Sequence, residues 1–195
     1  MFNDLSSPLA YLQSRRSGRV REMVGPGPSE AELEAIIATA ARTPDHGKLS
    51  PWRFVVVPNS RRDDLAALLR RALDANQPDC TDAHRHKADE FARSGEALVV
   101  LLSAPIAGHK VPVWEQELSA GAVAMNLLHA AHAHGYVGSW LTGWAAYDPL
   151  VRDAFCTAPD ERIAGFFFFG SPSRELEERP RPERDRIVRT WDPPL

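Results

Sequence analysis

Residues 97–102 are apolar at every position, and so continuous a run is typical of a strand that is buried on both faces. Three further short runs predict strands at residues 54–57, 136–141 and 163–169. A strand buried on both faces needs a layer of other elements on each side of its sheet. Because helices are predicted between the strands in mixed order, we expect an α+β domain arranged as three layers, α/β/α.

Helix-start signals separate these strands. A side chain suited to an N-cap, followed by proline or by apolar residues at helical spacing, occurs four times: Ser7, Ser29, Ser60 and Asp148. Ser29 also forms an S-x-x-E capping box with Glu32. The polar segment 82–94 is expected to be helical, and Pro112 is expected to open a helix rich in small residues that runs toward Gly135. Five or six helices are therefore predicted.

The composition fits a single domain without a strong electrostatic preference. The chain has 195 residues, of which 44% are hydrophobic and 25% are charged, and its net charge is −3. This length corresponds to one domain. The near-neutral charge gives no general attraction to nucleic acid or to anionic membranes. No apolar run approaches the roughly 18 residues that a membrane-spanning helix needs.

The N-terminal residues and the cysteines predict a cytoplasmic protein. Asn3 and Asp4 stand where a signal peptide would carry a basic leader. Cys80 and Cys156 are the only cysteines of the sequence and form no C-x-x-C pair. This usage fits a reducing compartment better than a disulfide-linked fold.

The C-terminal residues differ from the rest of the chain. Ten of the fourteen residues in the segment 173–186 are charged, so this segment cannot bury enough apolar surface to fold alone. Ile187, Val188 and Trp191 follow it. An apolar end beyond a polar arm suggests that the terminus docks some distance away, on a second subunit. A loosely bound surface tail is the alternative.

The seven histidines form no recognisable metal site. His129 and His132 are three residues apart on a predicted helix, but no H-E-x-x-H arrangement accompanies them. We therefore expect no metal, and we interpret all histidines except His46 as surface or hydrogen-bonded side chains. The chain also lacks a G-x-S-x-G elbow and a P-loop, which removes the main support for a hydrolase or a P-loop protein.

Three segments carry more polar chemistry than a turn or a helix end needs. Residues 15–19 (RRSGR) combine guanidinium groups with a hydroxyl and a glycine, which suits a phosphate, although a solvated helix end also explains such a cluster. Residues 42–54 join a helix to a strand and exceed the roughly 2 to 6 residues of an ordinary connection. Residues 109–121 lead into the helix rich in small residues.

Together these segments resemble the short bacterial members of the nitroreductase family, the FMN-dependent NAD(P)H oxidoreductases. The resemblance rests on the double arginine and serine at 15–17, on TPDHGKLSPWRF, on HKVPVWEQELSAG and on the strand end GFFFFGSP, and it runs from about Leu12 to Trp191. It implies a nitroreductase-like fold with a central mixed, mostly antiparallel sheet flanked by helices, and an interlocked homodimer with FMN at its interface. Residues 1–195 would then form one FMN-binding domain, in which 171–195 are a C-terminal arm packing on the partner subunit.

The resemblance also implies which residues contact the cofactors. Its FMN contacts fall on Arg15, Arg16, Ser17, Arg42, His46, Trp140, Leu141 and Thr142. The family typically has arginine where this chain has Leu141, so a charged contact there is absent or replaced, whereas Thr142 keeps a hydroxyl. The family's NAD(P)H contacts fall on Ala130, Ala131, His132, Ala133, His134 and Gly135. A glycine that ends a helix also explains Gly135.

A flavin carries the hydride chemistry itself, so no catalytic side chain is required. A cation near N1 and the C2 carbonyl of a flavin favours its reduced state, and Arg16 or Arg19 is the candidate for that cation. The resemblance implies that NAD(P)H reduces the flavin and that a nitroaromatic compound, a quinone or a similar acceptor then oxidises it. Two alternatives stay open: a flavoenzyme of the same fold with another reaction, such as desaturation or dehalogenation, and a non-catalytic FMN-binding protein.

Overall fold

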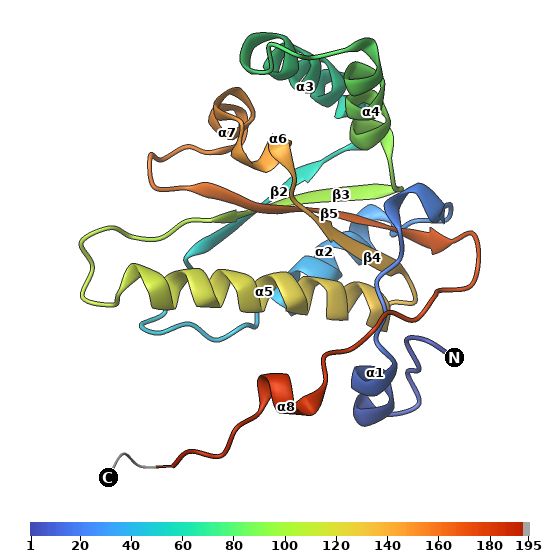
Figure 1. The fold of residues 1–195 in the computed structure, drawn as a ribbon, viewed down its shortest axis with the longest axis vertical. Helices are drawn as coiled ribbons and strands as arrows, with labels where there is room; N and C mark the ends of the chain where they lie inside the picture. The colour runs from blue at the N-terminus through green and yellow to red at the C-terminus, as the bar shows by residue number, and fades with distance from the viewer. Residues whose placement is uncertain (193–195) are drawn as a thin grey trace.

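The computed structural model describes residues 1–192 and is built around a five-stranded sheet. The strands are β1 (Met23–Val24), β2 (Trp52–Val57), β3 (Ala97–Ser103), β4 (Val137–Leu141) and β5 (Arg162–Pro172). β5 is central because it pairs with β1, β3 and β4, whereas β2 pairs with β3 (Figure 1). All these pairings are antiparallel. A mixed sheet was expected, but residues 1–192 of one chain contain no parallel pair of strands. The four predicted strands are confirmed, and β1 is too short to show a periodicity.

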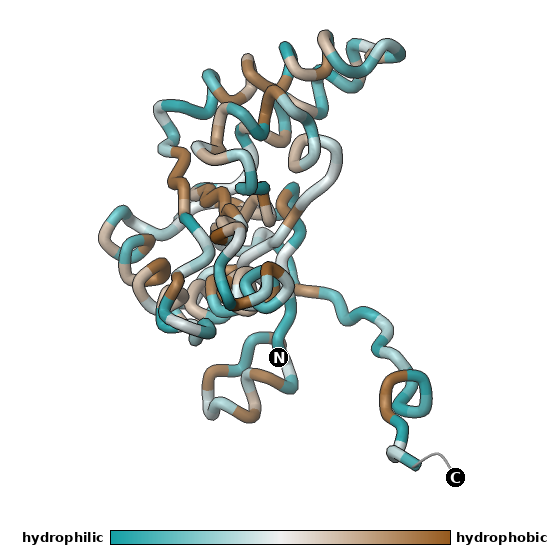
Figure 2. Tube along the Cα trace, turned by 90° about the vertical axis from the view of Figure 1, so that its left-hand side faces the viewer, coloured by the Kyte–Doolittle hydropathy of each residue, from teal (hydrophilic) through white to brown (hydrophobic). Residues whose placement is uncertain are grey.

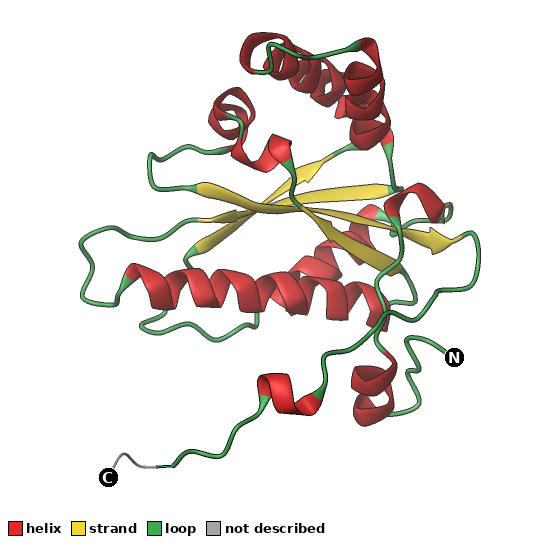
Figure 3. Cartoon of the chain, in the orientation of Figure 1, coloured by secondary structure: helices red, strands yellow, loops and turns green. Residues whose placement is uncertain are grey.

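Helices cover both faces of the sheet (Figures 1 and 3). On one face lie α3 (Arg62–Asn76), α4 (Asp82–Arg93), α6 (Trp144–Tyr147) and α7 (Pro149–Phe155); on the other lie α2 (Glu30–Ala40) and α5 (Val113–Ala133). The phenylalanines of β5 alternate between the two layers. Phe166 and Phe168 pack in the first core, Phe167 and Phe169 pack in the second, and all four side chains are fully buried. The predicted α+β domain of three layers is confirmed.

Local signals account for most helix starts. Three of the four predicted N-caps are confirmed by hydrogen bonds from the first helical turn: Ser7, Ser29 and Asp148. The prediction for Ser60 is wrong, because Asn59–Arg61 form a 3₁₀ turn and α3 begins only at Arg62. The described residues hold eight α-helices where five or six were predicted. The four-residue helices α6 and α8 (Arg184–Ile187) are too short to be recognised by periodicity.

Both ends of the chain leave the three layers (Figures 1 and 2). α1 (Pro8–Ser14) lies beyond α5, and the residues after Pro172 run away from the body as an arm that includes α8. The apolar residues near the end of this arm are open to solvent: Ile187, Val188 and Trp191 are 65%, 45% and 76% exposed. Packing of the arm on a partner stays a prediction, and residues 193–195 of the predicted arm lie outside the described residues.

Candidate functional site

The arginine-rich segment 15–19 lies against the edge of β4. The N–H of Gly18 donates to the carbonyl of Gly138 at 3.2 Å. A Cβ atom at Gly18 would lie 2.8 Å from Cγ2 of Val137, so a larger residue does not fit this close approach. A cavity of about 430 Å³ opens beside the segment, and Ser139 of β4 also lines it. The strand therefore fixes the predicted phosphate-binding residues at the rim of a cavity.

The charges of two arginines in the C-terminal arm act on this segment. Burial lowers the pKa of the Arg16 guanidinium, and the positive charges of Arg181, Arg179 and Arg15 lower it further, while Glu178 opposes them. Positively charged guanidinium groups repel one another, and an anion between them relieves the repulsion. They also form paired, charge-assisted hydrogen bonds with phosphate oxygens. The cluster is therefore suited to a phosphate ester.

The sequence did not indicate that the charges of Arg179 and Arg181 would act on Arg16. The segment Arg179 to Pro182 alternates arginine and proline, and proline favours an extended backbone that presents neighbouring side chains outward. That signal was present but did not indicate which part of the molecule the arm would reach.

Arg16 and Arg19, the two candidates for a cation beside the flavin, differ in their partners. The guanidinium of Arg19 forms ion pairs with Glu22 at 3.3 Å and with Glu177 of the arm. A hydrogen bond to Glu22 and the charge of Glu177 raise the pKa of Arg19. By contrast, Nε of Arg16 donates to the neutral backbone carbonyl of Glu177. The charge of Arg19 is thus partly neutralised by acidic partners.

The third predicted FMN segment lies at the end of β4, next to the arginines. Leu141 lines the cavity of segment 15–19 and also a second cavity of about 540 Å³, to which Trp140, Thr142 and residues of α3 and α4 contribute. Nε1 of Trp140 donates to the carbonyl of Ala164 at 2.9 Å, and the indole stacks on Phe167. The structure therefore brings two of the three predicted FMN segments to adjoining cavities.

Arg42 and His46 lie elsewhere. Nδ1 of His46 is 2.7 Å from Oε2 of Glu115 at the start of α5, and 67% of the His46 side chain is exposed. This loop runs on the α5 side of the sheet (Figure 1), and neither Arg42 nor His46 lines the two cavities at β4. Within one chain, the structure does not bring these two predicted contacts to segment 15–19.

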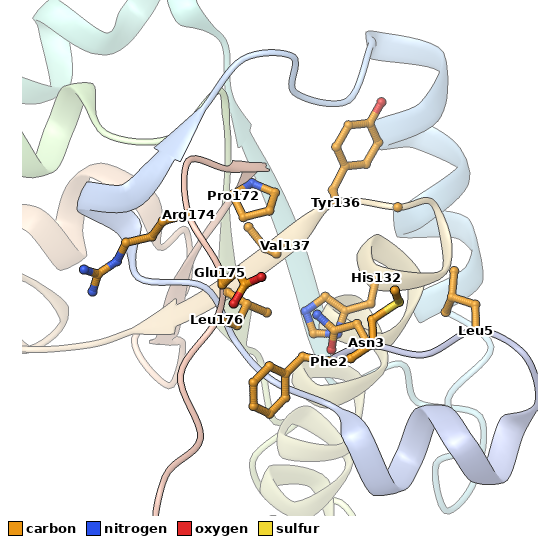
Figure 4. A pocket seen from close by; sticks show the side chains of 12 residues that line it. Phe2, Asn3, Leu5, His132, Tyr136, Val137, Pro172, Arg174, Glu175 and Leu176 are labelled. Atoms are coloured by element: carbon orange, nitrogen blue, oxygen red, sulfur yellow. The ribbon is translucent and has the colours of Figure 1, made fainter.

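The predicted NAD(P)H segment is the C-terminal end of α5. Ala130, Ala131 and His132 are buried. Gly135 has a φ of +87° and its N–H donates to the carbonyl of His132, so helix termination accounts for this glycine. Of the six predicted residues, His132 and Gly135 line a cavity of about 520 Å³ between the N-terminal residues and the start of the arm (Figure 4).

The part of the chain that the structure describes contains no group of three or more histidine, cysteine or acidic side chains placed to hold a metal ion. None of its helices combines the length and the apolar character needed to cross a membrane.

Known proteins resemble the chain over most of its length. The sequence model of the nitroreductase family matches residues 12–171. YdjA of Escherichia coli strain K12, named as a candidate NAD(P)H nitroreductase, is 34% identical over 169 residues, which cover 84% of this chain and 87% of YdjA. A protein of Haemophilus influenzae, also named as a candidate NAD(P)H nitroreductase, is 32% identical over 176 residues, or 89% of this chain and 92% of that protein.

Solved structures share the fold. A nitroreductase-like family protein from Bacillus cereus has a TM-score of 0.80 at 18% identity, covering 98% of this chain and 99% of its own. A candidate nitroreductase from Desulfovibrio desulfuricans, solved in complex with FMN, has a TM-score of 0.71 at 20% identity, covering 96% and 99%. These likenesses confirm the fold expected from the motifs. Together with the sequence matches, they show that the chain belongs to the nitroreductase family.

Proposed function

We propose that the protein is an oxidoreductase that binds FMN, takes a hydride from NAD(P)H and passes it through the flavin to a nitroaromatic compound, a quinone or a similar acceptor. Family membership supports the reaction class, the name of the Escherichia coli relative supports the donor, and the FMN complex of the Desulfovibrio protein supports the cofactor. The observation that carries the proposal is the cavity at the edge of β4, which Arg16, Ser17 and Arg19 line together with Leu141.

The groups at β4 fit FMN in charge and in size. The FMN phosphate is anionic, and Arg15 and Ser17 offer a charge-assisted donor and a hydroxyl donor beside one another. Nη1 of Arg15 already donates to Oγ of Ser17 at 3.3 Å, so the two groups converge. The adjoining cavities of about 430 and 540 Å³ each lie within the range of roughly 300–1,000 Å³ that is common for ligand sites.

The chain binds, orients and tunes the cofactor in this proposal. When bound, FMN supplies the hydride chemistry. Arg15 and Ser17 hold the phosphate, and Arg16 is the cation that favours the reduced flavin. Leu141 brings no charge to the position where the family typically has arginine.

The proposal includes a homodimer. Arg42 and His46 lie on the α5 side of the sheet, while segment 15–19 lies at the edge of β4. If all of these residues contact FMN, the loop and segment 15–19 at one cofactor must come from different subunits. Two chains related by a twofold axis would form two such sites.

A groove beside β2 suits the arm of the partner subunit. The cavity has a volume of about 490 Å³, with apolar walls from α2 and β2 and three carboxylates: Glu30, Glu34 and Glu96. β2 pairs with β3 alone among the described strands, so its outer edge is open to a further strand. Residues 184–191 of the arm carry arginines around Ile187 and Val188, and therefore complement the groove in charge and in apolar surface.

We also assign the protein to the cytoplasm, as the cysteine usage predicts. Cys80 and Cys156 are free thiols, which suits a reducing compartment.

The visible spectrum of the purified protein tests the proposal. We expect flavin absorbance that bleaches when NADPH or NADH is added without oxygen and returns when menadione or nitrofurazone follows. Flavin that neither nicotinamide reduces would favour another flavoenzyme reaction or a non-catalytic FMN-binding protein. A colourless protein that takes up no FMN would contradict the proposal.

A variant that ends at Pro172 tests the arm and the dimer. We expect it to sediment as a monomer and to bind FMN more weakly than the full chain. A truncated protein that stays dimeric and retains its FMN would show that the arm is not part of the subunit interface.

A further inference from the structure

Tyr11 and two histidines join α1 to α5. The hydroxyl of Tyr11 lies 2.7 Å from Nδ1 of His129 and 2.8 Å from Nδ1 of His132. The phenol ring meets both imidazole rings edge to face, at interplanar angles of 80° and 70°. Positions three apart on a helix share a face, so a single hydroxyl can bridge them. Because α1 contains no fully buried residue, this polar contact is important for fixing its position.

His132 continues the contact to β4. Its side chain is only 1% exposed, and its Nε2 accepts the N–H of Gly138 at 3.3 Å. The carbonyl of the same Gly138 accepts the N–H of Gly18 at 3.2 Å. Arg15 lies between these two anchors, four residues after Tyr11 and three residues before Gly18. Both attachments therefore converge on one residue of β4.

The proton positions in this chain follow from burial. Burial, with the charges of Arg15 and His129, lowers the pKa of His132 to about 4, so the ring is neutral near pH 7. Since its Nε2 accepts a hydrogen bond, its single proton is on Nδ1 and is donated to the Tyr11 oxygen. Burial raises the pKa of Tyr11 to about 12. The phenol therefore keeps its proton and donates it to Nδ1 of His129.

We propose that Tyr11 is a positioning residue for FMN, which acts through His129 and His132 to hold the end of α1 so that Arg15 and Ser17 meet the phosphate. This inference rests on the proposed function, because it takes FMN to be the ligand of segment 15–19. The charge of Arg15 acts on all three rings: with burial it lowers the pKa values of His129 and His132, and it opposes the rise that burial causes in the pKa of Tyr11. A displacement of the Tyr11 phenol would therefore change the position of the Arg15 guanidinium, which binds the phosphate in this proposal.

Tyr11→Phe removes the bridging oxygen, and Tyr136→Phe is its matched control. The hydroxyl of Tyr136 donates to Oε1 of Glu32 at 3.0 Å, so it contacts α2 and takes no part in the contact between α1 and α5. Its side chain lines the cavity beside His132 (Figure 4). Each variant thus removes the hydrogen-bonded hydroxyl of a half-buried tyrosine. We expect the Kd for FMN, measured by quenching of flavin fluorescence, to rise about tenfold in Tyr11→Phe and to change less than about twofold in Tyr136→Phe.

Riboflavin separates positioning of the phosphate site from general loosening of the fold, because riboflavin lacks the phosphate. Its Kd should be the same in wild type and Tyr11→Phe. The ³¹P resonance of bound FMN should move in Tyr11→Phe and stay in place in Tyr136→Phe. Equal FMN affinities of the two variants, or an equal loss of riboflavin and FMN affinity in Tyr11→Phe, would overturn the proposal.

Position 129 offers a second pair of variants that leaves Tyr11 intact. Glutamine supplies an acceptor oxygen for the Tyr11 hydroxyl, whereas leucine supplies none. We expect His129→Gln to retain most of the FMN affinity of wild type and His129→Leu to lose about as much as Tyr11→Phe. Equal affinities of these two variants would contradict a role for the hydrogen bond.

The tautomers of the histidines test the hydrogen-bond chain without any cofactor. In ¹⁵N-labelled protein without ligand, we expect His132 to carry its proton on Nδ1 and His129 to carry its proton on Nε2. A proton on Nε2 of His132 would overturn the chain. If wild-type protein binds no FMN, the proposed function fails and the cofactor role of Tyr11 fails with it, whereas these tautomers still decide whether the chain exists.

Discussion

Gly165 of β5 lies directly beneath the indole of Trp140. A Cβ atom at Gly165 would lie 2.1 Å from Nε1 and 2.4 Å from Cδ1 of that indole. The indole is also held by the hydrogen bond from Nε1 to the carbonyl of Ala164 and by stacking on Phe167, with ring centroids 5.4 Å apart. The glycine therefore provides the space that lets Trp140 lie flat on the sheet, directly before Leu141 of the proposed FMN site.

An irregularity in β5 supplies the acceptor for this indole. Leu101 of β3 pairs with Gly165, but the next residue, Leu102, pairs with Ile163. Ala164 is thus an extra residue in the strand, and its carbonyl is free to accept the indole N–H instead of a ladder hydrogen bond. The bulge and the glycine act together to place one side chain.

Gly165→Ala should displace the indole of Trp140. The added methyl group overlaps the ring, and such overpacking typically costs about 1–3 kcal/mol. Urea denaturation measures this cost, and near-ultraviolet circular dichroism reports the movement of the indole. In a Trp140→Ala background the same substitution should cost much less, because the methyl group then meets no ring. Equal costs in the two backgrounds would show that the glycine serves another purpose.

The sequence predicts the parts of this fold that depend on neighbouring residues. Ser29 and Asp148 are recognisable as N-caps because the N–H groups that they accept lie two or three residues further along the chain. The buried strands are recognisable because β3 is apolar throughout. Ser60 has the same local pattern as the true caps, but the turn after Pro58 includes it. The residues next to Ser60 in the sequence do not by themselves indicate that α3 begins later, at Arg62.

The candidate site depends on contacts between residues far apart in the sequence. The charge of Arg181 acts on Arg16 from 165 positions away, and Tyr11 meets His132 across 121 positions. Neither pair has a local signature, and no spacing rule connects them. Family resemblance indicated segment 15–19 without predicting the arm arginines beside it. For Arg42 and His46 the resemblance predicted FMN contacts, but one chain alone does not bring these two residues to the other predicted contacts.

Arg181→Ala should weaken FMN binding without affecting riboflavin. Loss of one charge-assisted contact to the phosphate corresponds to about 1.5–3 kcal/mol, or roughly a ten- to hundredfold rise in Kd. The loss should shrink at high salt, because Arg181 is partly exposed and screened. Arg71→Ala, which removes an exposed arginine of α3, is the control and should bind FMN like wild type. Similar losses in both variants would indicate a general effect of net charge.

Asp148 connects α7 to α3. Its Oδ1 accepts the N–H groups of Leu150 and Val151 at 2.9 and 3.2 Å, and its Oδ2 accepts from Nδ2 of Asn76 at 2.9 Å. Asp148→Ala removes all three bonds from a buried position and should destabilise the protein by about 2–3 kcal/mol. Asp148→Ser keeps an N-cap oxygen and should cost only about 1 kcal/mol. Thermal and urea denaturation distinguish the two, and equal costs would contradict the capping role.

His132 should make the folded protein sensitive to acid. Burial, with the charges of Arg15 and His129, lowers its pKa from 6.5 to about 4 in the folded state. As the pH decreases, His132 therefore takes up a proton near pH 6.5 in the unfolded chain but only near pH 4 in the folded chain. The free energy of unfolding falls as the pH decreases through this window. At about 1.4 kcal/mol per pH unit, the loss reaches about 2 kcal/mol at pH 5.

His132→Gln isolates this contribution, because glutamine does not titrate. The variant should be less stable than wild type at pH 7.5, since it disturbs the contacts with Tyr11 and Gly138. Between pH 7.5 and pH 5, however, its free energy of unfolding should fall by about 2 kcal/mol less than that of wild type. All other titrating groups are common to both proteins and cancel in the comparison. Parallel pH profiles would mean that His132 is protonated in the folded protein near its ordinary pKa, and a neutral ring that donates from Nδ1 to Tyr11 would then be excluded at pH 5.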